Sequence, residues 1–156
     1  LGNQTSPNTA WLLMRSLETL KLRMDKQEAN AKEVAEFIAN HSKVEAIHYL
    51  GMLQDNPQQQ AIFDKQCKGT GAVVAFEIKG GEKEAFTFLN NLKLIKLAVS
   101  LGGTESLAEH PASMTHAGVD PVERAHHGVT DKLVRISVGV ENTADLIADI
   151  KQALEA

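Results

Sequence analysis

The sequence predicts an α/β (α+β) fold, a small and mainly antiparallel sheet of about four strands with helices on one face. Three observations predict it. Stretches with helical apolar spacing alternate along the chain with short runs of strand character. The order is helix, strand, helix, strand, helix, strand, loop, strand, helix. The length of 156 residues suits one domain, which can bury about two-thirds of its unfolded surface.

The composition excludes several classes of protein. An apolar content of 43% with 23% charged residues is typical of a soluble globular domain, and no apolar run approaches the roughly 18 residues of a membrane span. A net charge of −4 with scattered basic residues argues against a nucleic-acid partner. The single cysteine, Cys67, predicts a cytoplasmic location, and no signal peptide is recognisable. The chain begins at Leu1 rather than Met, so we interpret it as a piece of a longer protein.

A long helix is predicted at the start of the chain. Ser6 before Pro7 is a helix-start signal, a capping hydroxyl followed by proline at the first helical position. Unbroken to about Asn40, the helix is about 50 Å long, more than one small domain needs. We therefore interpret residues 1–156 as a single domain in which residues 1–40 form a strut toward a second body. The apolar stripe of this helix consists of Leu13, Leu17, Leu20, Met24, Ala31, Ala35 and Ile38.

Two strands and two helices are predicted next. Val44–Leu50 is a short strand, and Asn56 before Pro57 begins a short helix. The second strand is recognised by apolar side chains at every other position. A glycine pair at 80–81 then turns the chain into a second helix. The alternating strand residues are Val74, Phe76 and Ile78, and the stripe of the second helix is Ala85, Phe88, Leu89 and Leu92.

The predicted site begins at the third strand. Leu94–Val99 has the aliphatic content of a buried strand, and the glycine pair at 102–103 lets the backbone turn sharply or approach a ligand closely. Thr104 then caps a predicted helical turn that runs through Glu109. Free N–H groups at such a helix start, beside the Ser100 hydroxyl, favour an anion site. An ordinary strand-to-helix connection gives the same pattern.

About thirty residues without strong periodicity follow, which indicates a functional loop or disorder. Asp120 before Pro121 predicts one short helix within this loop, ended by Gly128. The last strand is Leu133–Val138, and Asn142 caps the helix after it. The stripe of that helix is Leu146, Ile147, Ile150 and Leu154.

Arg135 is the most informative single residue. An arginine in the middle of a short strand is costly unless its guanidinium meets an anion. Strand alternation places it on the same face as Ser137. A bidentate clamp on a carboxylate or phosphate explains the pattern, and so does a solvent-facing charge. Ser100 becomes its neighbour if the third and last strands pair.

Other kinds of site are poorly supported. Four histidines fall in the loop region without a cysteine or carboxylate to complete a zinc site. We expect His110 and His116 to make polar contacts that shape the loop. A triad of Ser100, His116 and Asp120 lacks a nucleophile-elbow pattern, and the glycine pair is no dinucleotide fingerprint. We therefore assign neither a catalytic nor a metal-binding residue. The four histidines are His110, His116, His126 and His127.

Two stretches carry a resemblance to a known family. SLGGTESLAEHPASMTH at 100–116 and LVRISVGVENTADLIADIKQAL at 133–154 resemble the pyridoxal-phosphate (PLP) enzymes of cysteine and methionine metabolism, the trans-sulfuration enzymes. SPNTAW at 6–11 and LKLRM at 20–24 match the long helix that opens their C-terminal domain. The resemblance implies the C-terminal domain of a fold-type I PLP-dependent transferase, with residues 1–40 linking toward an absent PLP-binding domain.

The resemblance also implies roles for single residues. Arg135 is implied to bind the substrate α-carboxylate, assisted by Ser100, with Val99 and Leu101 beside them. Val99 stands where cystathionine-handling members tend to carry Glu, which makes the chain similar to methionine γ-lyase and acyl-homoserine sulfhydrylase members. Alternatively Val99 merely ends a strand, packed in the core. The family's covalent lysine lies in a Ser-x-Thr-Lys-type segment, which is missing here, so no cofactor-binding residue is assigned.

The function that the resemblance implies is γ-elimination or γ-replacement on a sulfur amino acid, with PLP, in a cytoplasmic homotetramer. This chain supplies the carboxylate clamp and is expected to be inactive by itself. Cystathionine γ-synthase, cystathionine γ-lyase and O-acetylhomoserine sulfhydrylase activities are alternatives within the family. A non-catalytic small-molecule or interaction module that reuses the fold is the alternative outside it.

Overall fold

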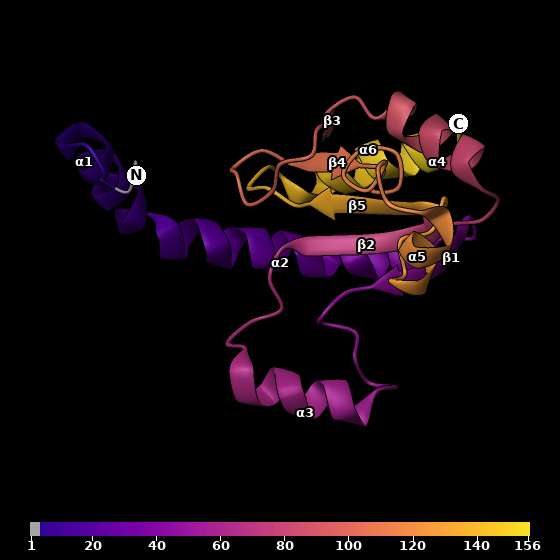
Figure 1. Ribbon diagram of the computed structural model, residues 1–156, viewed down its shortest axis with the longest axis horizontal. Helices are drawn as coiled ribbons and strands as arrows, with labels where there is room; N and C mark the ends of the chain where they lie inside the picture. Colours follow the sequence, from indigo (N-terminus) through magenta and orange to yellow (C-terminus); the bar gives the residue numbers. More distant parts are fainter. Residues whose placement is uncertain (1–3) are drawn as a thin grey trace.

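The computed structural model describes residues 4–156, so the first three residues of the predicted strut lie outside the described residues. The elements alternate largely as expected (Figure 1). In chain order they are α1 (Pro7–Glu18), α2 (Leu20–Ala39), β1 (Val44–His48), α3 (Pro57–Gln66), β2 (Val73–Ile78), α4 (Glu82–Asn91), β3 (Lys96–Leu97), β4 (Leu107–Glu109), α5 (Pro121–His126), β5 (Leu133–Ser137) and α6 (Thr143–Leu154).

The strands form one sheet with the order β1-β2-β5-β4-β3. The pairs β1–β2, β2–β5 and β5–β4 are antiparallel, and the edge pair β4–β3 is parallel. The predicted small, mainly antiparallel sheet is therefore confirmed, whereas the count of about four strands is corrected to five. The strand that was missed is β4, because residues 104–109 were predicted to form a helical turn. Backbone pairing with strands on both sides favours the extended conformation instead.

Helices α2, α4 and α6 pack on one face of the sheet, as predicted, and their apolar sides join it in a single core. Strand alternation divides the two faces cleanly: Ala108 and Ile136 point into this core, while their neighbours Glu109 and Arg135 point to the other face. The largest fully buried apolar side chains are Phe76, Phe88, Ile38, Ile95, Ile136, Leu146 and Ile150. The candidate clamp thus lies on the side of the sheet opposite the helices.

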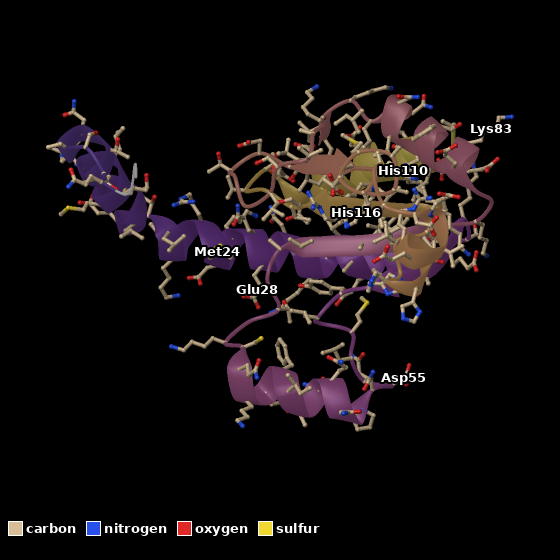
Figure 2. All side chains as sticks on the ribbon, viewed as in Figure 1. Met24, Glu28, Asp55, Lys83, His110 and His116 are labelled. Atoms are coloured by element: carbon tan, nitrogen blue, oxygen red, sulfur yellow. The ribbon has the colours of Figure 1, made fainter. Side chains whose placement is uncertain are left out.

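The first helix is broken, which corrects the prediction of one continuous helix. The break is at Thr19, where φ is −105° and ψ is 1°, and α1 leaves the line of α2 there (Figure 1). Threonine is a weak helix former, so little local propensity opposes the break. Nothing in α1 is buried, and the predicted stripe is exposed as far as Met24, which lies in the projecting part of α2 (Figure 2). The stripe continues as buried side chains at Ala31, Ala35 and Ile38.

Several predicted helix starts are confirmed. The side chains of Asn56, Asp120 and Asn142 accept hydrogen bonds from the first turns of α3, α5 and α6. The third predicted strand, Leu94–Val99, is corrected, because β3 is only two residues long and Ile95 is the one fully buried side chain of that run. Within residues 4–156, none of the helices is long and apolar enough to cross a membrane.

Candidate functional site

The Arg135 guanidinium makes three polar contacts with the protein. Arg135 lies directly opposite Glu109 in the antiparallel β4–β5 pair, and its Nη1 is 2.8 Å from Glu109 Oε1. Its Nη2 donates to the carbonyl oxygens of Val99, at 2.9 Å, and Ser100, at 3.2 Å. The side chain is 20% exposed. The alternative of a simple solvent-facing charge is therefore wrong, since a carboxylate and two carbonyls surround this arginine.

The same guanidinium retains donors for a further anion. A guanidinium carries five N–H groups, and the contacts to Glu109, Val99 and Ser100 occupy at most three of them. Nε is buried and has no hydrogen-bond partner among the described residues. Arg135 is thus oriented by the protein without being saturated by it, as a carboxylate clamp requires.

The loop after β3 brings the other predicted residues to Arg135. Ser100 does not reach it by direct strand pairing, because β4 lies between β3 and β5; the contact is made by backbone carbonyls instead. The side chains of Val99 and Leu101 are 51% and 53% exposed, and Ser100 between them is exposed as well. The alternative that Val99 packs in the core is therefore wrong. A substrate-binding role for Arg135, Ser100, Val99 and Leu101 stays a prediction.

The predicted anion site at a helix start is also corrected. Residues 101–106 contain no helix, and the Gly102 N–H donates to Ser137 Oγ at 2.9 Å rather than remaining free. Gly102 has φ +77°, a left-handed conformation that glycine adopts readily. Ser137 and Arg135, on the same face of β5, therefore hold consecutive parts of one loop.

Buried polar side chains of α2 support this loop from the other side. Gln27 donates to the carbonyl of Gly103. Asn30 donates to the carbonyls of Gly139, at 3.0 Å, and Glu141, at 2.8 Å. The Glu141 carboxylate in turn accepts from the N–H of Ser106 at 2.6 Å and from its hydroxyl at 2.9 Å. The loop's position is thus set by hydrogen bonds to α2 and to the segment after β5.

A second carboxylate holds the chain just before β3. Asp149 of α6 is buried. Its two oxygens accept hydrogen bonds from the backbone N–H groups of Lys93, Leu94 and Ile95 at 2.8–2.9 Å. The segment that leads into Val99 is therefore tied to the core helix α6.

Two of the four histidines, His110 and His116, make polar contacts within the loop region. His110 is buried. Its Nε2 lies 2.7 Å from the carbonyl oxygen of Asp131, and its Nδ1 lies 2.8 Å from Ser113 Oγ. His116 contacts Thr115, and Asp120 caps α5. The predicted loop-shaping role is confirmed for His110. No group of three potential metal ligands is found among residues 4–156.

Glu109 and the hydrogen-bonding role of Ser137 were not predicted from the sequence. For Ser137 the signal was present, because strand alternation already placed it on the same face as Arg135. For Glu109 there was no usable signal, since a three-residue strand is too short to show a period. Gln27 and Asn30 were missed as well, because polar residues on a helix are usually solvated.

Lys132 is the one lysine of residues 4–156 whose side chain is partly buried. Its ammonium lies 2.7 Å from a Glu45 carboxylate oxygen and 3.2 Å from a Glu77 carboxylate oxygen. Hydrogen bonds with Glu45 first and Glu77 second raise the pKa of Lys132 above its ordinary value. A more firmly protonated amine is a poorer nucleophile. Lys132 is therefore disfavoured as a nucleophile, and the position of the covalent lysine outside this chain stays a prediction.

Solved structures with this fold define the class. The chain superposes with a TM-score of 0.92 on a cystathionine γ-lyase of Micromonospora echinospora, at 37% identity, covering 99% of this chain and 40% of that one. A protein of Campylobacter jejuni described as an O-acetylhomoserine (thiol)-lyase gives 0.91 at 35% identity, covering 99% and 37%, and contains N'-pyridoxyl-lysine-5'-monophosphate. The fold is that of a domain from the PLP-dependent lyases.

The sequence makes the assignment more specific. The family described as Cys/Met metabolism PLP-dependent enzyme matches residues 1–155, so the chain belongs to this family. The L-methionine γ-lyase of Pseudomonas putida is 50% identical over 155 residues, which is 99% of this chain. The chain spans about 38% of the length of that relative. The family resemblance found in the sequence is confirmed.

Proposed function

We propose that this chain is the substrate-binding C-terminal domain of a PLP-dependent enzyme that acts at the γ-carbon of a sulfur amino acid. The reaction is methionine γ-lyase-like elimination or a γ-replacement. The observation that carries the proposal is the Arg135 guanidinium, held beside the loop 99–101 with N–H groups left over for an anion. Sequence identity with an L-methionine γ-lyase supports the choice of reaction.

The loop beside Arg135 supports a substrate with an uncharged tail. Val99 and Leu101 expose aliphatic side chains on either side of Ser100. An apolar wall next to a carboxylate clamp suits a thioether, whereas a distal ammonium loses water there without gaining a partner. In this proposal Arg135 binds and orients the α-carboxylate, Ser100 assists it, and Val99 and Leu101 exclude water from the substrate's tail.

The cofactor belongs to the part of the enzyme that is absent here. PLP, when bound, supplies an electron sink that stabilises carbanions, and its covalent lysine lies outside this chain. The exposed apolar side chains of α1 support contact with that PLP-binding part, because large exposed apolar patches mark interaction surfaces. We further propose a homotetramer for the whole enzyme and, from the single cysteine, a cytoplasmic location.

Three alternative functions are tested against this proposal. Likeness to an O-acetylhomoserine (thiol)-lyase favours γ-replacement with a thiol as a second candidate reaction. A cystathionine γ-synthase or γ-lyase activity follows from the same family. A non-catalytic module that reuses the fold is the alternative class.

The deciding experiment uses the full-length protein that contains this chain. We expect it to release methanethiol from methionine in the presence of PLP, at a kcat/KM above that for cystathionine. Absence of turnover with sulfur amino acids, despite saturable amino-acid binding, supports the non-catalytic module. This chain alone is expected to give no saturable, borohydride-trappable lysine adduct with PLP, and a single such adduct would contradict the assignment of the covalent lysine to another part of the enzyme.

A further inference from the structure

Glu109 has an unusual environment for a buried carboxylate. The residue is 1% exposed, yet among the described residues its carboxylate makes one polar contact, from Oε1 to Arg135 Nη1 at 2.8 Å. Its second oxygen, Oε2, is buried without a hydrogen-bond partner. The one group that Glu109 serves is therefore the guanidinium of the candidate clamp.

Stability does not explain this arrangement. A buried ion pair is weak evidence for stability, because apolar residues of similar volume often do as well or better. A buried oxygen without a hydrogen-bond partner also destabilises the fold. Glu109 lies directly opposite Arg135 in the β4–β5 register, where its position is fixed by the sheet rather than by its own contacts. The Glu109 carboxylate therefore interacts with Arg135 and does not stabilise the core.

Two effects of Glu109 on the guanidinium follow from the geometry. By accepting at Nη1, it fixes the plane of the guanidinium together with the carbonyls of Val99 and Ser100. Its negative charge also lies in contact with the cation, so a second anion at Arg135 is bound against the repulsion of the first. The first effect favours binding of a carboxylate, and the second opposes it.

We propose that Glu109 is a positioning residue that sets the affinity of Arg135 for the substrate carboxylate, orienting the guanidinium while moderating its charge. The inference rests on the proposed function, because it takes Arg135 to be the carboxylate clamp. It adds a residue whose side chain touches the clamp and not the substrate. The two effects are separable, since one depends on reach and the other on charge.

The test compares two ligands in the full-length holoenzyme. L-norleucine has the shape of methionine without a leaving group at the γ-carbon, and L-norleucinamide lacks the carboxylate. The ratio of their Kd values, measured by calorimetry, gives the carboxylate preference. Glu109→Gln keeps an acceptor for Nη1 and removes the charge, so we expect the preference to rise about threefold to tenfold. Glu109→Asp keeps the charge and shortens the reach, so we expect it to fall by a similar factor. The amide's affinity stays within twofold in both variants.

The matched control is Glu45→Gln. Glu45 also pairs with Lys132, but it lies on β1, which β2 separates from the strand of Arg135, so its loss leaves the carboxylate preference unchanged. Suppose that the parent enzyme prefers the acid over the amide. If neither Glu109 variant changes this preference, or if both change it in the same direction, the inference about Glu109 is overturned while the clamp stands. A parent enzyme that binds acid and amide equally overturns the clamp itself, and with it the role of Glu109. Equal changes for acid and amide show a merely structural role and also overturn the inference.

Discussion

Two buried carboxylates, Glu109 at the candidate site and Asp149 beside the segment before β3, have their hydrogen-bond acceptors filled to opposite degrees. Asp149 accepts three backbone N–H groups, from residues 93–95, through both of its oxygens. Glu109 touches one cation through one oxygen and leaves the other without a partner. This difference distinguishes a structural carboxylate from a functional one in this protein. The structural carboxylate, Asp149, accepts backbone hydrogen bonds at both oxygens, whereas the carboxylate at the candidate site, Glu109, has one oxygen without a hydrogen bond.

Substitution of the structural carboxylate, Asp149, is expected to have the largest effect. Asp149→Ala removes the acceptor of three backbone N–H groups, of which that of Ile95 is buried, and each charge-assisted bond contributes about 1.5–3 kcal/mol. We expect the free energy of unfolding to fall by about 3–5 kcal/mol, because water and relaxation recover part of the loss. Chemical denaturation of the chain measures it. The control is Asp145→Ala in the exposed first turn of the same helix, and a loss no larger than that control's contradicts the structural role.

Arg135 tests the functional side of the comparison. Arg135→Lys keeps the charge and loses the planar fork that meets Glu109 and the loop carbonyls together. We expect a loss of about 2–4 kcal/mol in transition-state stabilisation, because the clamp both binds and orients the substrate. Steady-state kinetics on the full-length enzyme measure it. A kcat/KM close to that of the parent enzyme shows that the carboxylate is bound elsewhere.

A substitution at Val99 adds a third carboxylate to the comparison, in the exposed part of the site. In the full-length enzyme, the glutamate of Val99→Glu can pair with a distal ammonium of the substrate. We expect the ratio of kcat/KM values to shift about tenfold toward cystathionine and away from methionine, equivalent to about 1.4 kcal/mol. Because the Val99 side chain is largely exposed, the melting temperature should change little. An unchanged substrate ratio contradicts the specificity role, whatever the melting temperature does.

Glu28 extends the comparison to a partly exposed carboxylate and gives the smallest effect. Figure 2 shows it on α2 beside the segment that follows α3, where it accepts from Thr70. The Thr70 N–H first, and Lys32 second, lower the pKa of Glu28 below its ordinary value of 4.5. A lowered folded-state pKa stabilises the protein above the unfolded value, and this is lost as pH falls through the folded value. Glu28→Gln should therefore lower the melting temperature at pH 7 but not in strong acid. An equal loss at both pH values contradicts the linkage.

Local signals were enough to predict much of the fold. The capping residues Asn56, Asp120 and Asn142 correctly predicted the starts of three helices. A capping side chain lies within a few residues of the N–H groups that it binds, so the local sequence is sufficient. Alternation at Arg135 and Ser137 gave their shared face for the same reason. Both kinds of signal are contained in a single element, so no tertiary contact was needed to see them.

The parts that were missed depend on contacts between distant segments. Strand β4 forms because β5 and β3 pair with it on both sides, and three residues carry no period of their own. The Glu109–Arg135 contact joins two strands across the long loop. The break at Thr19 separates an exposed helix from a packed one, and packing of α2 on the sheet, not propensity, decides where the packed part begins.

The exposed first helix has an optical consequence. Trp11 is the only tryptophan of the sequence. It is 60% exposed on α1, with the Arg15 guanidinium carbon 5.9 Å from the ring centroid. Indole fluorescence shifts to shorter wavelength when the ring leaves water for an apolar surface. The tryptophan emission of this chain therefore comes from one position, on α1. The wavelength of maximum tryptophan emission therefore indicates, without an added label, whether another surface covers α1.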